Sequence, residues 1–159
     1  MSVRIRNMMK SDVGRVHEIE CACFRTPWSK LSLLGELKNH VAVYLVAQNE
    51  VNTIVGYGGM WVVYDEAHVT NIAVSAESRR QGIAKSLMLE LMERALQRGA
   101  DKMTLEVRET NVAAQTLYTQ LGFVKNGFRP RYYSDTGEGA HLMWNDDIAK
   151  TVASFVNLC

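Results

Sequence analysis

Residues 71–85 read NIAVSAESRRQGIAK, and this stretch decides the fold class of the 159-residue chain. The apolar pattern up to Val74 predicts a strand, and the apolar residues after Gly82 recur at the spacing of an α-helix. The short connection between these two elements carries Arg79 and Arg80. A strand that passes through a tight basic turn into a helix predicts a mixed α/β protein with an anion site at the junction.

The chemistry of this junction favours a diphosphate ligand. The first amides of a helix have no partners inside the helix and carry partial positive charge, worth about 0.3–1 kcal/mol per anion contact. Gly82 lets the backbone approach a bulky ligand, and Lys85 adds its charge to those of Arg79 and Arg80. The Gly-Lys-Thr ending of nucleotide hydrolases and the three spaced glycines of dinucleotide-binding proteins are both missing. An ordinary helix start with solvated arginines is the competing interpretation.

Apolar periodicity predicts the rest of the secondary structure. Strands are expected at residues 3–6, 41–48, 53–63, 67–74, 102–107, 123–129 and 140–144. Helices are expected at residues 12–24, 29–38, 82–98 and 111–121, with Gly99 and Gly122 as end signals. These elements form one α/β (α+β) domain in residues 1–148, with a mixed, mostly antiparallel, twisted sheet flanked by helices. Residues 149–159 form a mildly amphipathic tail to which the sequence assigns no role.

Composition argues against several classes of partner. With 47% hydrophobic residues and a formal net charge of +1, the chain gives no reason to expect binding to nucleic acid or to a membrane. No apolar run has membrane-spanning length, no secretory signal is recognisable, and the three cysteines suit the cytoplasm. Cys21 and Cys23 face different ways on one predicted helix and Cys159 lies far along the chain, so no metal site is expected. The histidines lack ligand spacing and are interpreted as structural or solvated: His17, His40, His68 and His141.

The spacing Arg79-x-x-Gly82-x-Ala84 resembles the Q/R-x-x-G-x-G/A signature of the GNAT family of N-acetyltransferases. The strand at 71–74 fits this family, as do Asn111 and the apolar residues that follow it up to residue 123. The likeness covers about residues 3–144. It is greatest with the RimI-type enzymes, bacterial members that acetylate the N-terminal alanine of a small-subunit ribosomal protein. The segments that carry this closer likeness are residues 27–29, 65–67, 71–74, 105–108 and 131–133.

The resemblance implies the fold of this family and acetyl-coenzyme A as co-substrate. It implies the N-terminal peptide of a protein, in particular a ribosomal protein, as the acceptor. In such enzymes the strand backbone at 72–74 pairs with the pantetheine arm, and the turn at 80–85 binds the pyrophosphate. The cofactor contacts implied in this way are Ile72, Ala73, Val74, Arg79, Arg80, Gln81, Gly82, Ile83, Ala84, Lys85 and Asn111.

Glu106 is the candidate general base. It lies in the otherwise apolar segment 104–107, where a carboxylate is unfavourable unless it is paired or used. Burial would raise the pKa of this carboxyl group, which would suit a base. A residue that faces solvent or pairs with Arg108 is an equally good interpretation of the sequence alone. The family resemblance implies the catalytic role.

Tyr118 is the candidate general acid. It lies on the apolar face of the helix predicted at 111–121, where its spacing equally fits a core tyrosine. A phenol is protonated at neutral pH and can donate a proton to a leaving thiolate. The resemblance implies this role. A thioester is already activated, so no catalytic cysteine is needed.

The acceptor site is predicted from four residues: Trp28, Arg131, Tyr132 and Tyr133. Exposed aromatic and cationic side chains are suited to holding a peptide. We expect one of the two tyrosines to pack within the hairpin, and Trp28 to serve the core first and the acceptor pocket second. The family loop usually carries an acidic residue where this chain has Gly139. The alternatives are an acetyltransferase for a small-molecule amine and a non-catalytic acyl-coenzyme A-binding module.

Overall fold

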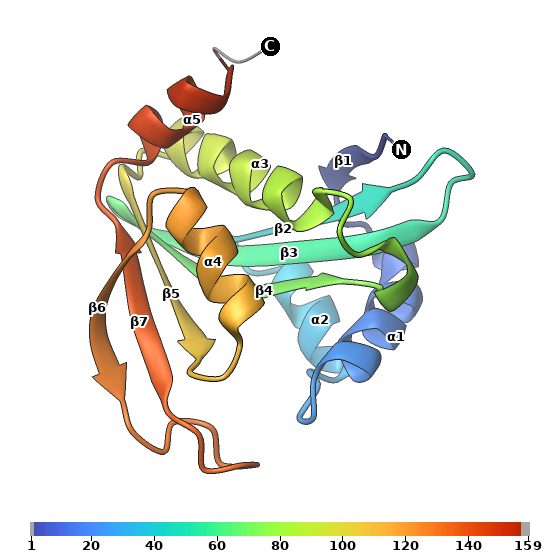
Figure 1. The fold of residues 1–159 in the computed structure, drawn as a ribbon. Helices are drawn as coiled ribbons and strands as arrows, with labels where there is room; N and C mark the ends of the chain where they lie inside the picture. The colour runs from blue at the N-terminus through green and yellow to red at the C-terminus, as the bar shows by residue number, and fades with distance from the viewer. Residues whose placement is uncertain (1, 157–159) are drawn as a thin grey trace. The chain divides into compact units, whose positions relative to one another are not determined.

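Seven strands form one sheet in the order β1-β2-β3-β4-β5-β7-β6 in the computed structural model, which describes residues 2–156 (Figure 1). The strands are β1 (Arg4–Asn7), β2 (Ala42–Gln48), β3 (Ile54–Val63), β4 (Glu66–Val74), β5 (Lys102–Arg108), β6 (Val124–Arg129) and β7 (Ala140–Asn145). β4 and β5 are parallel, whereas the β1–β2, β2–β3, β5–β7 and β6–β7 pairs are antiparallel. The prediction of a mixed, mostly antiparallel sheet is therefore confirmed.

The helices are α1 (Val13–Cys23), α2 (Lys30–Leu37), α3 (Ile83–Gln97), α4 (Val112–Gln120) and α5 (Ile148–Val156), with short 3-10 helices η1 (Lys10–Asp12) and η2 (Ala76–Ser78). Each predicted strand and helix is present. The sequence does not predict η2, and it indicates only an amphipathic tail where α5 begins. Cys159 lies outside the described residues.

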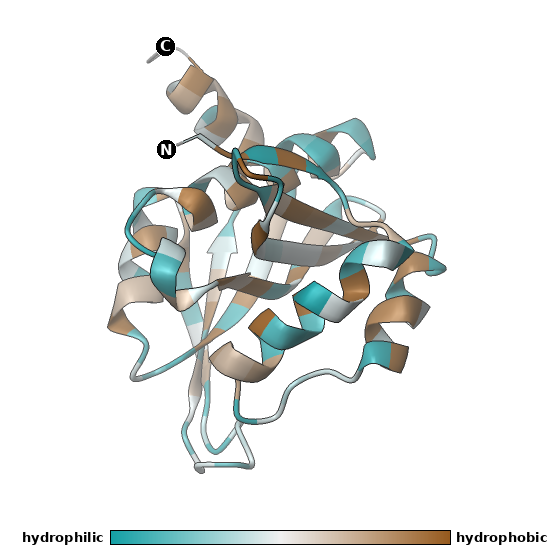
Figure 2. Ribbon diagram, turned by 90° about the vertical axis from the view of Figure 1, so that its right-hand side faces the viewer, coloured by the Kyte–Doolittle hydropathy of each residue, from teal (hydrophilic) through white to brown (hydrophobic). Residues whose placement is uncertain are grey.

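The chain divides into two compact units. The first holds the described residues up to Trp61 together with Thr70–Leu91, and the second holds Val62–Val69 together with the described residues from Met92 onward. Figure 2 shows mostly hydrophobic colour along the central strands, whereas the helices carry both hydrophobic and hydrophilic stretches. This distribution is expected when helices bury one face against a sheet.

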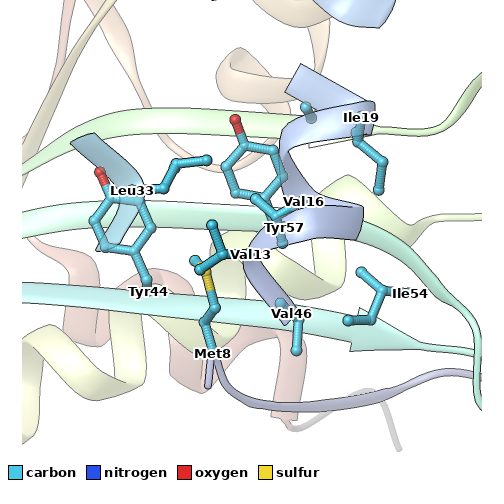
Figure 3. Packing of buried hydrophobic residues seen from close by; sticks show 10 residues of the cluster. Met8, Val13, Val16, Ile19, Leu33, Tyr44, Val46, Ile54 and Tyr57 are labelled. Carbon is cyan, nitrogen blue, oxygen red and sulfur yellow. The ribbon is translucent and has the colours of Figure 1, made fainter. Parts of the chain in front are cut away.

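The core of the first unit forms where α1 meets β2 and β3. Val13, Val16 and Ile19 recur every third residue along α1, and all three are buried. Their partners in this cluster include Val46 of β2 and Tyr57 of β3 (Figure 3). Full burial of such a side chain stabilises the fold by about 1.5–3 kcal/mol. The core thus fixes α1 and the segment that follows it.

The start of α3 lies close to β3 because β3 carries a glycine there. A Cβ atom at Gly56 would lie 3.1 Å from the carbonyl oxygen of Ala73 and 3.2 Å from Cγ2 of Ile83. Ile83 is the first residue of α3 and is buried. A side chain at position 56 would therefore crowd the backbone of β4 at Ala73 and the side chain of Ile83 at the start of α3.

The second unit is built on β5, with the first residues of β4 on one side and β7 on the other. His68 lies opposite Thr104 in the parallel β4–β5 register. The side-chain amide of Asn145 donates to the carbonyl oxygen of Leu121 over 2.9 Å, and the hydroxyl of Thr151 in α5 donates to the same oxygen over 3.2 Å. These bonds tie the end of α4 to β7 and α5. The loop between β6 and β7 extends past the ends of both strands (Figure 1).

Candidate active site

The turn between β4 and α3, where the sequence predicts an anion site, has an uncommon backbone conformation. Arg80 has φ 64° and Gly82 has φ 77°, so two residues of the turn are left-handed. Turns with such residues gather backbone N–H groups around a concave site that suits an anion. A Cβ atom at Gly82 would meet no heavy atom within 4 Å, so the positive φ, rather than lack of space, favours glycine. The amide of Ser86 donates to the carbonyl oxygen of Gly82 over 3.0 Å and begins the hydrogen bonding of α3.

Arg79 secures this turn to the end of β4. Its Nε atom donates to the carbonyl oxygen of Val74 over 3.2 Å. The thiol of Cys23 donates to the same oxygen over 3.6 Å and accepts from Nη2 of Arg79 over 3.5 Å. Arg79, which is predicted to contact the cofactor, therefore forms hydrogen bonds with Val74 and Cys23 in this structure. The exposed predicted contacts are Arg79, Arg80, Gln81 and Gly82 in the turn and Lys85 in α3, whereas Ala84 is half-buried. Ile72, Ala73 and Val74 are the last residues of β4.

A buried carboxylate holds the segment that carries Trp28. Glu20 accepts hydrogen bonds from the amide of Trp28 over 2.9 Å, from the side-chain amide of Asn71 over 3.5 Å and from the hydroxyl of Tyr57. Burial raises the pKa of the Glu20 carboxyl, although the bonds from Trp28 and Asn71 oppose this shift. Trp28 packs against the core of the first unit, with its ring centre 6.5 Å from that of Tyr44. Its predicted packing role is confirmed, and its contact with the acceptor stays a prediction.

Glu106 pairs with a histidine that the sequence does not single out. Nε2 of His68 lies 2.6 Å from Oε2 of Glu106. The Glu106 side chain is 13% exposed and that of His68 is 39% exposed. Both alternatives for Glu106, an exposed side chain and a pair with Arg108, are therefore wrong. His68, which the sequence analysis interprets as structural or solvated, is partly exposed and bonds to the candidate base.

The pKa of Glu106 is lowered, whereas the sequence analysis expects it to be raised. Burial is the largest influence and raises the pKa of this carboxyl group. The hydrogen bond and charge of His68, together with the charge of Arg129, outweigh burial and lower the pKa overall. The expected raised pKa is wrong because opposite charges next to a half-buried carboxyl favour its ionised form. Glu106 is thus ready to accept a proton at neutral pH, but it is a weak base.

Tyr118 is almost completely enclosed. It is 5% exposed, and its ring centre lies 5.8 Å from that of Phe123. Burial, and secondarily the phenol of Tyr133, raise the pKa of Tyr118, so its hydroxyl stays protonated. Asn111 caps the helix that carries Tyr118, because its Oδ1 atom accepts from the amide of Ala114 over 3.1 Å. Asn111 is predicted to contact the cofactor, and in this structure its side-chain oxygen caps α4.

Arg108, the last residue of β5, holds the loop at residues 130–139. Its Nη2 donates to Oδ2 of Asp135 over 2.8 Å, and its Nη1 donates to Oδ1 of Asp135 and Oε2 of Glu138, each over 3.2 Å. Glu138 also accepts a hydrogen bond from Thr110. Arg108 lowers the pKa of the Asp135 carboxyl, and bonds from Thr110, Thr136 and Arg108 lower that of Glu138. A planar guanidinium bound through two nitrogens fixes orientation as well as position.

The two loop tyrosines differ as expected. The Tyr133 ring lies under the guanidinium of Arg108, 4.0 Å from Cζ to the ring centre. Tyr132 is 44% exposed, stands edge-on to Tyr133 with ring centres 5.1 Å apart, and faces Arg129 at 5.7 Å. Burial raises the pKa of Tyr133 to about 12. Arg131 is exposed, and its φ of 54° turns the chain before the pair.

The structure brings four of the predicted residues into one electrostatic neighbourhood. Burial is the main cause of the raised pKa of Tyr132 and of Tyr133, and the negative charge of Glu106 is a smaller cause for both. Tyr133 in turn raises the pKa of Tyr118. These mutual effects indicate that the candidate base, the candidate acid and the loop tyrosines lie near one another.

Gly139 leaves room for an aromatic ring. A Cβ atom at this position would lie 2.2 Å from Cζ of Phe128. Phe128 is 47% exposed and packs against His141, with ring centres 5.2 Å apart. A side chain at position 139 would displace this ring, which gives a physical reason for the departure from the family pattern.

Residues 2–156 were compared with the requirements of a metal site and of a membrane-spanning helix, and they meet neither. Within them, no group of three or more His, Cys, Asp or Glu side chains is arranged to hold a metal ion. None of the helices in the same range is long and apolar enough to cross a membrane.

Comparison with known proteins gives a consistent result. The acetyltransferase (GNAT) family profile matches residues 13–123. A Bacillus subtilis protein provisionally named as a ribosomal protein bS18-alanine N-acetyltransferase is 40% identical over 141 residues, covering 88% of this chain and 93% of its own length. The Haemophilus ducreyi protein of that name is 36% identical over 130 residues, covering 81% and 88%. The crystal structure of ribosomal-protein-S18-alanine N-acetyltransferase from Escherichia coli superposes with a TM-score of 0.81 at 29% identity, covering 89% of this chain and 92% of that chain.

Proposed function

Because this chain belongs to the acetyltransferase (GNAT) family, we propose that it acetylates the N-terminal α-amino group of a protein, with acetyl-coenzyme A as donor. The names of the relatives from Bacillus subtilis and Haemophilus ducreyi support an N-terminal alanine of a ribosomal protein as the acceptor. With that substrate, the reaction takes place in the cytoplasm.

The observation that carries this proposal is the cluster of Glu106, Tyr118, Tyr132 and Tyr133. It combines an ionised carboxylate, a phenol that stays protonated, and an aromatic pair on a loop fixed by Arg108. Transfer of an acetyl group to an amine needs a proton acceptor, a proton donor and a surface that holds the amine-bearing chain. A non-catalytic binding module has no use for the first two.

The proposed reaction proceeds by direct attack. Glu106 accepts a proton from the α-ammonium group, and the neutral nitrogen forms a bond with the thioester carbonyl carbon. The carbon–sulfur bond then breaks, and the hydroxyl of Tyr118 donates a proton to the sulfur. Tyr118 is restored by the second proton that the nitrogen loses. Overall, one proton passes to solvent for each acetyl group transferred.

An α-amine suits this site better than a lysine. An α-amino group has a pKa of about 7.7–8.0 and a lysine side chain one of about 10.4. The lowered pKa of Glu106 makes it a weak base, so it deprotonates the more acidic ammonium more readily. The same property supports a protein N-terminus over a polyamine.

The donor is proposed to bind along β4 and the turn that follows. The amides near Gly82 and the charges of Arg80 and Lys85 fit a diphosphate, and the last residues of β4 offer backbone to the pantetheine arm. Arg79 serves this site by holding the turn against Val74.

The proposal is tested by thiol release from acetyl-coenzyme A. A peptide that begins with alanine should support turnover, whereas the same peptide with a blocked N-terminus and a panel of polyamines and free amino acids should not. Peptides that begin with serine and methionine measure the breadth of the specificity. Turnover on small amines without turnover on any of these peptides would overturn the proposal.

A further inference from the structure

The side-chain amide of Gln115 joins α4 to the end of β5. Its Nε2 atom donates to the carbonyl oxygen of Arg108 over 3.0 Å and to that of Glu109 over 3.1 Å. An amide nitrogen of this kind carries two hydrogens, so these bonds use both of them. Gln115 is 9% exposed, and a buried polar side chain is stable in such a place when its donors are bonded.

The two elements joined in this way carry the candidate base and the candidate acid. Glu106 precedes Arg108 by two residues in β5, so both side chains leave the strand on the same face. Tyr118 follows Gln115 by three residues, and these two are the buried residues of α4. Residues three apart share one face of a helix. The contact of Gln115 with β5 therefore lies about one helical turn from the proposed proton donor.

We propose that Gln115 is a positioning residue that acts through Tyr118, because it fixes the phenol relative to Glu106. This inference rests on the proposed acetyl transfer. Glu106 serves the amine and Tyr118 serves the sulfur, so the reaction needs both groups at a fixed separation. A shift of α4 against β5 would move the phenol away from the sulfur without removing either group. A misplacement of about 1 Å can reduce a rate by about 10²-fold.

Further bonds hold α4 at its two ends. The side chain of Asn111 caps its start, and the carbonyl oxygen of Leu121 accepts two hydrogen bonds just after its last residue. Gln115 lies between these ends and bonds to the strand that carries the candidate base. Its contact therefore restrains the part of the helix that holds Tyr118.

A purely structural role for Gln115 predicts a different result. Without the amide, two carbonyl oxygens would each lose a donor, which destabilises the fold but leaves the rate of the folded fraction unchanged. Changes at Gln115 and at Tyr118 would then have independent effects on kcat. A positioning role makes the two effects non-additive, because Gln115 contributes nothing to kcat once the phenol hydroxyl is absent.

The test is a double-mutant cycle of Gln115→Met and Tyr118→Phe, with saturating alanine peptide and acetyl-coenzyme A. Methionine is unbranched, as glutamine is, and donates no hydrogen bond. Gln115→Met alone should lower kcat by at least about tenfold and change both KM values by less than about twofold. In the Tyr118→Phe background, the same change should alter kcat by less than about twofold. An unchanged kcat in either single variant, or equal losses from Gln115→Met in both backgrounds, overturns the proposal.

Gln120→Met is the matched control, because it makes the same replacement at an exposed position of α4. It should keep the wild-type kcat and both KM values. If Gln115→Met does not fold, Gln115→Asn takes its place in the cycle with the same expected outcomes. Asparagine keeps the amide but shortens the side chain by one methylene group.

A measurement on the wild-type protein separates this proposal from the proposed function. NMR of the side-chain amide groups should show slow hydrogen exchange with solvent for Gln115 and fast exchange for Gln120. Fast exchange at Gln115 overturns the proposal, whatever the substrate. Absence of turnover on every peptide, with Gln115 protected from exchange, would instead count against the proposed function.

Discussion

The turn between β4 and α3 and the loop between β6 and β7 hold their shapes in different ways. The turn depends mainly on backbone conformation at Arg80 and Gly82 and on the bond from Arg79 to Val74, with one distant contact from Cys23. The loop depends on Arg108, whose partners Asp135 and Glu138 follow it by 27 and 30 positions. The proposed donor site is therefore built mainly from local conformation, and the proposed acceptor site from side chains distant in sequence.

This difference has a consequence for how the two sites can change. A φ of 77° at Gly82 disfavours residues other than glycine by about 1–2 kcal/mol, whatever the surroundings. The loop is fixed by charges and an aromatic ring, which other combinations of side chains can supply. The proposed acceptor site is therefore expected to tolerate more substitutions than the proposed donor site.

The largest effect is expected from Glu106→Gln, which sharpens the comparison because it removes the proton acceptor and leaves the turn at Gly82 and the ion pairs of the loop in place. kcat should fall by roughly 10²- to 10⁴-fold, since the proton acceptor is lost. The KM values for acetyl-coenzyme A and for the alanine peptide should stay near those of the wild type. Steady-state kinetics measures all three constants. Glu109→Gln, at an exposed carboxylate of the same segment, serves as control. An equal loss in both variants would rule out the role of Glu106.

A smaller and more selective effect is expected from Arg108→Gln, which breaks the acceptor side of the comparison. Loss of the bonds to Asp135 and Glu138 and of the contact with Tyr133 releases the loop. A hydrogen bond to a charged group contributes about 1.5–3 kcal/mol, so KM for the peptide should rise by about tenfold. KM for acetyl-coenzyme A should not change.

Lys102→Gln is the control for this variant, because Lys102 also forms two ion pairs from β5, with Asp65 and Asp101. Both of those partners are largely exposed, so neither KM should change. A rise in KM for acetyl-coenzyme A in Arg108→Gln would mean that the two regions are not separate.

The smallest of the three effects is expected from Gly82→Ala, which alters the turn of the proposed donor site. An alanine at a φ of 77° is strained by about 1–2 kcal/mol, so the turn distorts and KM for acetyl-coenzyme A should rise severalfold. Gly99→Ala imposes similar strain at a φ of 92° at the end of α3. It should lower the melting temperature to a similar extent and leave KM unchanged. Equal changes in KM for the two variants would contradict an anion site at the turn.

The contrast between local and distant contacts also explains which features could be predicted from the sequence. The strand, turn and helix at 71–97 follow from local periodicity and from Gly82. Tyr118 follows from the helical spacing of its neighbours together with the family resemblance. All of these features depend on residues close in sequence.

Features that depend on distant contacts could not be predicted in the same way. His68 reaches Glu106 only because β4 pairs in parallel with β5, and a parallel pairing leaves no local pattern. The direction of the Glu106 pKa depends on that contact and on Arg129, so burial alone gave the wrong sign. The role of Arg108 likewise depends on the fold of the loop.

The site of acetylation tests the central claim most directly. A peptide with a free N-terminal alanine and an internal lysine is incubated with the protein and acetyl-coenzyme A, and the product is sequenced by tandem mass spectrometry. We predict one acetyl group, on the α-amine of alanine. Acetylation of the lysine with a free N-terminus would contradict the proposed function.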